Sequence, residues 1–64
     1  MTILRNAVRC LKCQEVIESL HIHDFKWCSC QSVAVDGGTV YLKRCGWPEE
    51  YEELSEWEGD LGDL

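Results

Sequence analysis

Four cysteines in two close pairs are the residues of this sequence best suited to chemistry. Cys10 and Cys13 form a Cys-x-x-Cys pair, Cys28 and Cys30 form a Cys-x-Cys pair, and fourteen residues lie between the two pairs. Four thiolates at such a spacing can supply the sulfur ligands of a closed, tetrahedral zinc site. The sequence therefore predicts that these four cysteines bind one structural Zn2+ ion.

Other uses of the cysteines stay open at this point. A disulfide framework suits small extracellular chains, but residues 1–5 begin no apolar run long enough for a signal peptide. A thioredoxin-type redox pair needs a βαβ context, and no helix is expected after Cys13. His21 or His23 could replace one cysteine as a ligand, although four cysteines already complete the shell. Cys45 stands apart from both pairs and is expected to be a free, partly buried thiol.

The length of the chain also argues for a metal. A domain of 64 residues buries only about 60 per cent of its unfolded surface, so its apolar core alone gives marginal stability. Zinc binding to deprotonated cysteines can contribute of order 10 kcal/mol at neutral pH. We therefore expect chelation of the metal to unfold the protein.

Charge divides the chain at Pro48. All six Lys and Arg residues precede it together with four acids, whereas eight acids and no base follow it. Free nucleic acid is repelled by such a tail, so we expect no direct nucleic-acid partner. No apolar run approaches the length that a bilayer requires, so we expect no membrane association either.

The elements that must position the cysteines are short strands. Residues 3–9 and 14–20 carry the apolar, β-branched pattern of a hairpin whose tip is the first cysteine pair. Residues 32–35 and 39–44 predict a second hairpin, with Asp36-Gly37-Gly38 as a tight turn. The predicted fold of residues 1–46 is thus a small β-rich, zinc-ribbon-like domain, with two short hairpins around a four-cysteine zinc site.

Residues 47–64 predict an acidic amphipathic helix appended to that domain. Pro48 suits the first turn of a helix, and the acids after it complement the helix dipole. Aromatic and leucine side chains recur at helical spacing, at Trp47, Tyr51, Leu54, Trp57 and Leu61. This stripe either packs on the ribbon or binds another chain, and the partner-binding residues would then be Trp47, Tyr51, Leu54 and Trp57.

Residues 21–27 and the second hairpin offer candidate contacts for a small ligand. The simplest structure for residues 21–27 is a loop with Phe25 and Trp27 packed in the core. An alternative function is binding of a small anionic ligand such as a nucleotide signal, with contacts from His21, His23, Asp24, Lys43 and Arg44. Asp24 could orient the neighbouring imidazole of His23, but no nucleophile stands at a fixed spacing from this pair. We therefore do not expect an enzyme.

Six short motifs follow one another along roughly residues 5–46. They are Arg9-Cys10-x-x-Cys13, Ile17-Glu18-Ser19, His21-x-His23-Asp24-Phe25, Cys28-Ser29-Cys30, Val35-Asp36-Gly37-Gly38 and Tyr41-Leu42-x-Arg44. In this order they resemble a family of very small, mostly uncharacterised proteins encoded by bacteriophages and prophages. Two features depart from the family pattern. Gln31 stands where many such knuckles have glycine, and the acidic extension follows Trp47.

The resemblance implies an accessory protein made in the cytoplasm of an infected host cell. The resemblance further implies that the protein binds a host protein and inhibits or modulates it, and a component of an anti-phage defence system is one target of this kind. The zinc would then be purely structural. Because so small a body leaves apolar surface uncovered, we also expect a homodimer.

Overall fold

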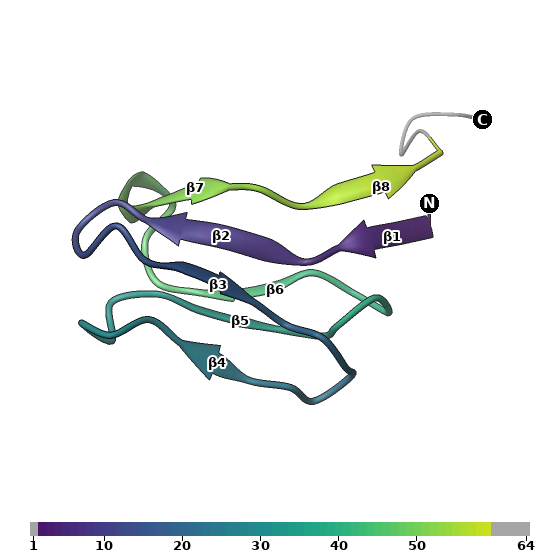
Figure 1. The fold of residues 1–64 in the computed structure, drawn as a ribbon, viewed down its shortest axis with the longest axis horizontal. Helices are drawn as coiled ribbons and strands as arrows, with labels where there is room; N and C mark the ends of the chain where they lie inside the picture. Colours follow the sequence, from purple (N-terminus) through teal and green to yellow (C-terminus); the bar gives the residue numbers. More distant parts are fainter. Residues whose placement is uncertain (1, 60–64) are drawn as a thin grey trace.

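The computed structural model describes residues 2–59, which form a β-rich fold of short strands (Figure 1). In chain order the elements are β1 (Thr2–Arg5), β2 (Ala7–Cys10), β3 (Val16–Glu18), β4 (Lys26–Trp27), β5 (Ala34–Asp36), β6 (Lys43–Cys45), the 3-10 turn η1 (Pro48–Glu50), β7 (Tyr51–Glu53) and β8 (Glu56–Glu58). The strands form three small sheets, ordered β1-β8, β3-β2-β7 and β4-β5-β6, and all their pairings are antiparallel. The predicted small β-rich fold is confirmed at this level.

The first hairpin is confirmed. β2 pairs with β3, with Val8 opposite Ile17, and the first cysteine pair lies in the connection between these strands. The turn between β2 and β3 and the turn between β4 and β5 lie at the same end of the molecule, whereas β1 and β8 lie at the other end (Figure 1). The predicted strand over residues 3–9 is interrupted, because Asn6 separates β1 from β2.

The second hairpin is also confirmed, but its predicted tight turn is wrong. Pairing of β5 with β6 ends where Asp36 lies opposite Lys43, so residues 37–42 form a longer loop. Gly37 and Gly38 have φ values of +105° and +53°, which side-chain-bearing residues rarely adopt. A Cβ on Gly38 would lie 2.4 Å from the backbone carbon of His21. The loop therefore combines local turn hydrogen bonds to the Gly37 carbonyl with a close contact to the distant segment at His21.

A small core lies between the sheets β3-β2-β7 and β4-β5-β6. Its buried members are Val8, Cys10, Ile17, Cys28, Val33 and Val35, with Cys13 and Tyr51 packed at its margin. The prediction that Phe25 and Trp27 pack in this core is wrong. These two side chains are 42% and 50% exposed, and their rings contact each other with centroids 5.6 Å apart. Trp27 belongs to β4, a two-residue strand at the edge of its sheet with both residues exposed, and Phe25 precedes this strand.

The predicted C-terminal helix is wrong for the described residues. After η1, which begins at Pro48, β7 pairs with β2 and β8 pairs with β1. A helix would place like charges four residues apart, at Glu49 and Glu53 and at Glu52 and Glu56, and such pairs destabilise a helix. The strands instead place glutamates opposite arginines on β1 and β2. Leu61 of the predicted stripe lies outside the described residues.

The sheets run across the predicted boundary between residues 1–46 and 47–64, since β7 and β8 share sheets with β2 and β1. That division into two parts stays a prediction. Within residues 2–59, no helix has the length and apolar character needed to cross a membrane.

Candidate metal centre

The first cysteine pair lies on a knuckle at the end of β2. The Cys10 N–H donates to the carbonyl of Glu15 at 2.8 Å, and the Gln14 N–H donates to the carbonyl of Cys10 at 2.8 Å. Gln14 closes this turn with a φ of +66°. The backbone therefore reverses within a few residues, and the sulfurs of Cys10 and Cys13 lie on the same side of it.

The second pair uses the same backbone arrangement in a turn one residue shorter. The Cys28 N–H donates to the carbonyl of Val33 at 2.9 Å, and the Gln31 N–H donates to the carbonyl of Cys28 at 2.9 Å. Gln31 has a φ of +60°. Glycine adopts this left-handed conformation at the least cost, so the conformation explains why glycine is common at the position that Gln31 occupies here. The shorter turn accommodates the Cys-x-Cys spacing.

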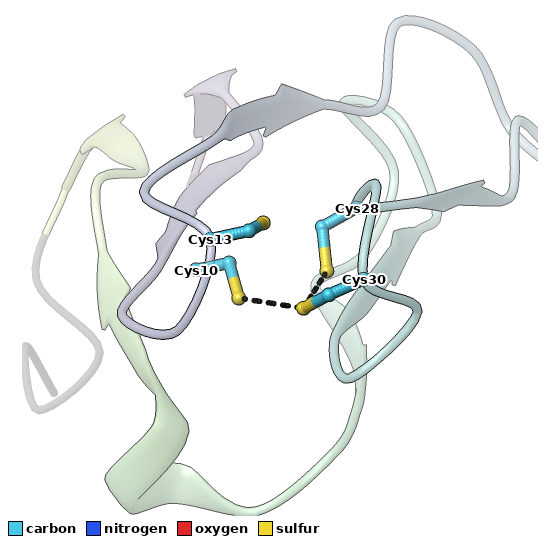
Figure 2. A group of neighbouring side chains, drawn as sticks. All are labelled: Cys10, Cys13, Cys28 and Cys30. Atoms are coloured by element: carbon cyan, nitrogen blue, oxygen red, sulfur yellow. Dashed lines mark hydrogen bonds between the residues drawn. The ribbon is translucent and has the colours of Figure 1, made fainter.

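The four sulfur atoms converge on one point between the two knuckles (Figure 2). All four lie within 4.8 Å of one another, and the sulfurs of Cys10 and Cys30 and of Cys28 and Cys30 are each 3.6 Å apart. A zinc ion with four bonds of about 2.3 Å in a tetrahedron separates its sulfur ligands by about 3.8 Å. A disulfide needs about 2.05 Å, and all five cysteines are free. The predicted four-cysteine cluster thus has the geometry of a metal site.

Burial and hydrogen bonding separate the proton affinities of these thiols. The Cys13 amide favours the Cys10 thiolate, but burial and hydrogen bonds with the Cys13 and Cys28 thiols oppose it, and the pKa of Cys10 rises to about 11. The hydroxyl and amide of Ser32 lower the pKa of Cys30 to about 6. Backbone amides, first that of Cys30, also lower the pKa of Cys13. Four adjacent thiolates need positive charge between them, which a divalent cation supplies.

Two further side chains connect the knuckles to their surroundings. The Glu15 carboxylate accepts hydrogen bonds from the amide and the hydroxyl of Ser29, so it joins the first knuckle to the second. The Lys12 ammonium lies 3.0 Å from the Glu50 carboxylate of η1, which raises the pKa of Lys12. The sequence analysis did not identify Glu15, whose role depends on the two knuckles lying side by side.

The histidines lie in an exposed turn before β4 and are absent from the metal cluster, whose members are all cysteines. The carboxylate of Asp24 in this turn accepts a hydrogen bond from the Leu20 amide at 2.8 Å and lies 3.3 Å from the Lys26 ammonium. These two contacts lower the pKa of Asp24, the Leu20 amide contributing most. Asp24 therefore stabilises its own turn.

Two basic residues, Lys43 and Arg44, were predicted to contact a small anionic ligand, and they differ in their surroundings. Lys43 is exposed, whereas the Arg44 side chain is only 11% exposed. The Arg44 guanidinium forms a two-bond pair with the Glu53 carboxylate, and its Nη2 also donates to the hydroxyl of Ser55 at 2.8 Å. Its donors are therefore used within the protein, where they join β6 to β7 and the residues after it.

A comparison with models of known protein families identifies the family of this chain. A family model described as a domain of unknown function (DUF7695) matches residues 2–46. The chain belongs to this family. No curated protein and no solved structure matches the sequence. The expected membership of an uncharacterised family is thus confirmed, and the phage origin stays a prediction.

The DUF7695 region contains a buried amide that sequence analysis missed. Asn6 is fully buried, and its Nδ2 lies within donating distance of three carbonyl oxygens in or beside the 37–42 loop. These are the carbonyls of Asp36, Gly38 and Tyr41, at 3.0, 2.9 and 3.2 Å. Its Oδ1 accepts a hydrogen bond of 2.7 Å from Arg44. The available signal was an asparagine inside an apolar strand pattern, where this residue type is depleted.

Ser19 continues this buried polar cluster of the DUF7695 region. It is 2% exposed, its hydroxyl donates to the carbonyl of Asp24 at 2.8 Å, and it accepts from the Gly38 amide at 2.9 Å. Its own amide donates to the carbonyl of Asn6 at 2.9 Å. We call Asn6, Ser19, Gly38 and Arg44 the polar hub. It holds the 37–42 loop and the turn before β4 against the junction of β1 and β2.

The residues predicted to bind a partner lie beyond the DUF7695 match. Trp47 and Trp57 are 70% and 41% exposed. Tyr51 and Leu54 are half-buried, and Tyr51 packs against the core beside the metal cluster. The structure therefore leaves the two tryptophans exposed, half-buries Leu54 and packs Tyr51 against the core.

Proposed function

We propose that this protein is a zinc-stabilised protein-binding module with a zinc-ribbon-like core and no catalytic activity. Four thiolates at tetrahedral spacing favour Zn2+ over harder ions such as Mg2+ and Ca2+, and they leave no open coordination position for a substrate. The ion would join the two knuckles and would take no part in a reaction.

The observation that carries the binding function is that all three tryptophans are exposed. Trp27, Trp47 and Trp57 have exposed fractions of 50%, 70% and 41%, whereas the core is built from valine, isoleucine, alanine and cysteine. Tryptophan is the costliest large side chain to leave in water and the one most enriched at the centre of protein interfaces. An exposed set of this kind in so small a protein supports a protein partner.

We further propose that this partner is a host-cell protein and that binding inhibits or modulates it. The support is the resemblance of residues 5–46 to phage-encoded proteins, which also implies a location in the host cytoplasm. Homodimerisation through the same aromatic side chains stays a prediction. The alternative of a small anionic ligand has less support, because five of the six bases already form ion pairs within residues 2–59.

The test is capture of a partner by the zinc-loaded protein, followed by affinity measurement with single variants. Trp47→Ala and Trp57→Ala should each weaken the complex by about tenfold or more, as expected for an interface anchor, while the protein keeps its metal and its circular dichroism spectrum. Leu4→Ala is a matched control, because Leu4 is an exposed apolar residue of β1 outside the aromatic set. A complex that all three variants form equally well would contradict the proposed role of the tryptophans.

A further inference from the structure

Four bases of the DUF7695 region each meet one glutamate of residues 47–58. The pairs are Lys12 with Glu50 at 3.0 Å, Arg9 with Glu52 at 2.9 Å, Arg5 with Glu56 at 4.0 Å, and Arg44 with Glu53 through two hydrogen bonds. Arg5 lies on β1, Arg9 on β2, Lys12 in the knuckle after β2 and Arg44 on β6, and we call these four residues the basic edge. Its charge complements that of the segment lying on it, which contains six acids and no base.

The same segment is also bound through its backbone. β7 and β8 add to β2 and β1 as antiparallel strands. The Leu11 amide donates to the carbonyl of Glu50 at 2.9 Å, and the Leu54 amide donates to the carbonyl of Ala7 at 3.0 Å. A nucleic acid has no strand backbone to pair with β2, whereas a peptide does. The chemistry that fits the basic edge is therefore an extended, acidic peptide.

Eight of the twelve residues of the segment that occupies the basic edge are exposed, and the other four, including Tyr51 against the core, are half-buried. None of the buried residues within residues 2–59 belongs to residues 47–58. The Arg9 and Lys12 side chains are 41% and 58% exposed, so their ion pairs are screened by water and salt. A segment with few buried apolar contacts opens more readily than the core. It also lies outside the family match, which ends at residue 46.

We propose that the basic edge is a binding site for an extended acidic segment of the partner protein, and that residues 47–58 keep this site closed by occupying it. The proposal rests on the proposed function, because it names the class of partner that the module binds. When residues 47–58 leave, β2 gains a free edge for strand addition and its bases become available. The released segment exposes Tyr51 and Leu54 beside Trp47 and Trp57.

The test measures binding of a fluorescent peptide with the sequence of residues 47–58 to the full, zinc-loaded chain. In the open variant, Glu52→Lys with Glu56→Lys, Arg9 and Arg5 repel the segment, so a larger fraction of molecules has the site open. We expect this variant to bind the peptide at least about tenfold more tightly than the unaltered chain, because apparent affinity scales with the fraction of open molecules. Binding should weaken as salt is raised.

A matched control separates site opening from net charge. Glu49→Lys with Glu58→Lys has the same net charge as the open variant, but neither glutamate forms an ion pair within the described residues. It should bind the peptide as the unaltered chain does. In the open variant, adding Arg5→Glu and Arg9→Glu restores opposite charges across the strands, and the tight binding should be lost.

Milder variants cover the case in which charge reversal prevents folding. Glu52→Gln with Glu56→Gln should raise peptide affinity several-fold over Glu49→Gln with Glu58→Gln. Equal peptide affinity in the paired and control variants, or no binding in either, would overturn the proposal. If the open variant bound a single-stranded oligonucleotide more tightly than the peptide, the proposal that the ligand is a peptide would be overturned. A partner complex that depends on Trp47 and Trp57 would leave the proposed function standing in all these cases.

Discussion

The two ends of β2 are held in opposite ways. At its C-terminal end, Cys10 joins three other cysteines whose sulfurs lie within 4.8 Å of one another, and a single ion can hold both knuckles. At its N-terminal end, Asn6 and the rest of the polar hub hold the chain with hydrogen bonds between a buried amide, a hydroxyl, a guanidinium and backbone carbonyls. One end can be held by a single metal ion, and the other is held by hydrogen bonds between buried polar groups.

The difference shows how such a small protein fixes both ends of a core that contains few large side chains. Metal ligation concentrates a large free energy in four side chains. The polar hub distributes a smaller one over several hydrogen bonds, each of which matters because its groups are buried. Three predictions test this contrast, from the largest expected effect to the smallest.

Loss of one metal ligand should have the largest effect. Cys13→Ser removes a thiol from the cluster, and because a metal ion bound there would contribute of order 10 kcal/mol, the variant should be unfolded at neutral pH. Chelation of the metal should unfold the unaltered protein in the same way. Circular dichroism and metal content by elemental analysis provide the measurements.

Cys45→Ser is the control for this change, since Cys45 is half-buried on β6 and outside the cluster. It should keep one metal ion per chain and remain folded. A Cys13→Ser protein that stays folded without metal would show that the polar hub alone can hold the fold, and the contrast between the two ends of β2 would fail.

Removal of the buried amide should have an intermediate effect. Asn6→Ala removes the side-chain donor to two buried carbonyls, of Asp36 and Gly38, and to the part-buried carbonyl of Tyr41, and it removes one acceptor of Arg44. The expected loss is about 3 kcal/mol in the free energy of unfolding, measured by urea denaturation of the zinc-loaded protein. Metal binding should persist, because Asn6 lies at the far end of β2.

Thr39→Ala provides the comparison, because Thr39 is an exposed residue of the same loop. Its free energy of unfolding should stay within about 0.5 kcal/mol of the unaltered value. If both variants lose the same stability, the polar hub is not what holds this end of the molecule.

The smallest effect is expected for the ion pair between Arg44 of the polar hub and Glu53 of β7. Burial opposes ionisation of Glu53, but hydrogen bonds from Arg44 and Ser55 outweigh it and lower the pKa of Glu53 below its ordinary value of 4.5. The folded state therefore favours the carboxylate. This stabilisation is present above pH 4.5 and is lost as the pH falls through the lower pKa of the folded state.

Glu53→Gln should therefore be slightly less stable than the unaltered protein at pH 7, by less than about 1 kcal/mol because this pair is partly exposed. The difference should shrink as the pH is lowered below 4.5. Urea denaturation at a series of pH values measures it, with Glu49→Gln as a control that removes a carboxylate without an ion pair in residues 2–59. If the stability difference between Glu53→Gln and the unaltered protein did not change with pH, the ion pair with Arg44 could not be its cause.

Much of the metal end was predictable from the chain itself. The spacing of Cys10, Cys13, Cys28 and Cys30 indicated the ligand set, and the apolar pattern around them indicated both hairpins. These features are local, because a knuckle closes over a few residues and a hairpin pairs neighbouring segments. The left-handed residues Gln14 and Gln31 that close the knuckles carry no strong signal in their side chains.

The tertiary structure alone decided the conformation of residues 47–58 and the role of Asn6. The aromatic spacing of the tail matched a helix, but free edges of β1 and β2 with their arginines exist only once the hairpins have formed, and they pair with the tail as strands. Asn6 likewise meets carbonyls more than thirty residues further along the chain only after the 37–42 loop packs against it. The spacing of the metal-binding cysteines can thus be read from the sequence. Strand partners and buried hydrogen-bond partners, in contrast, depend on which distant groups folding brings together.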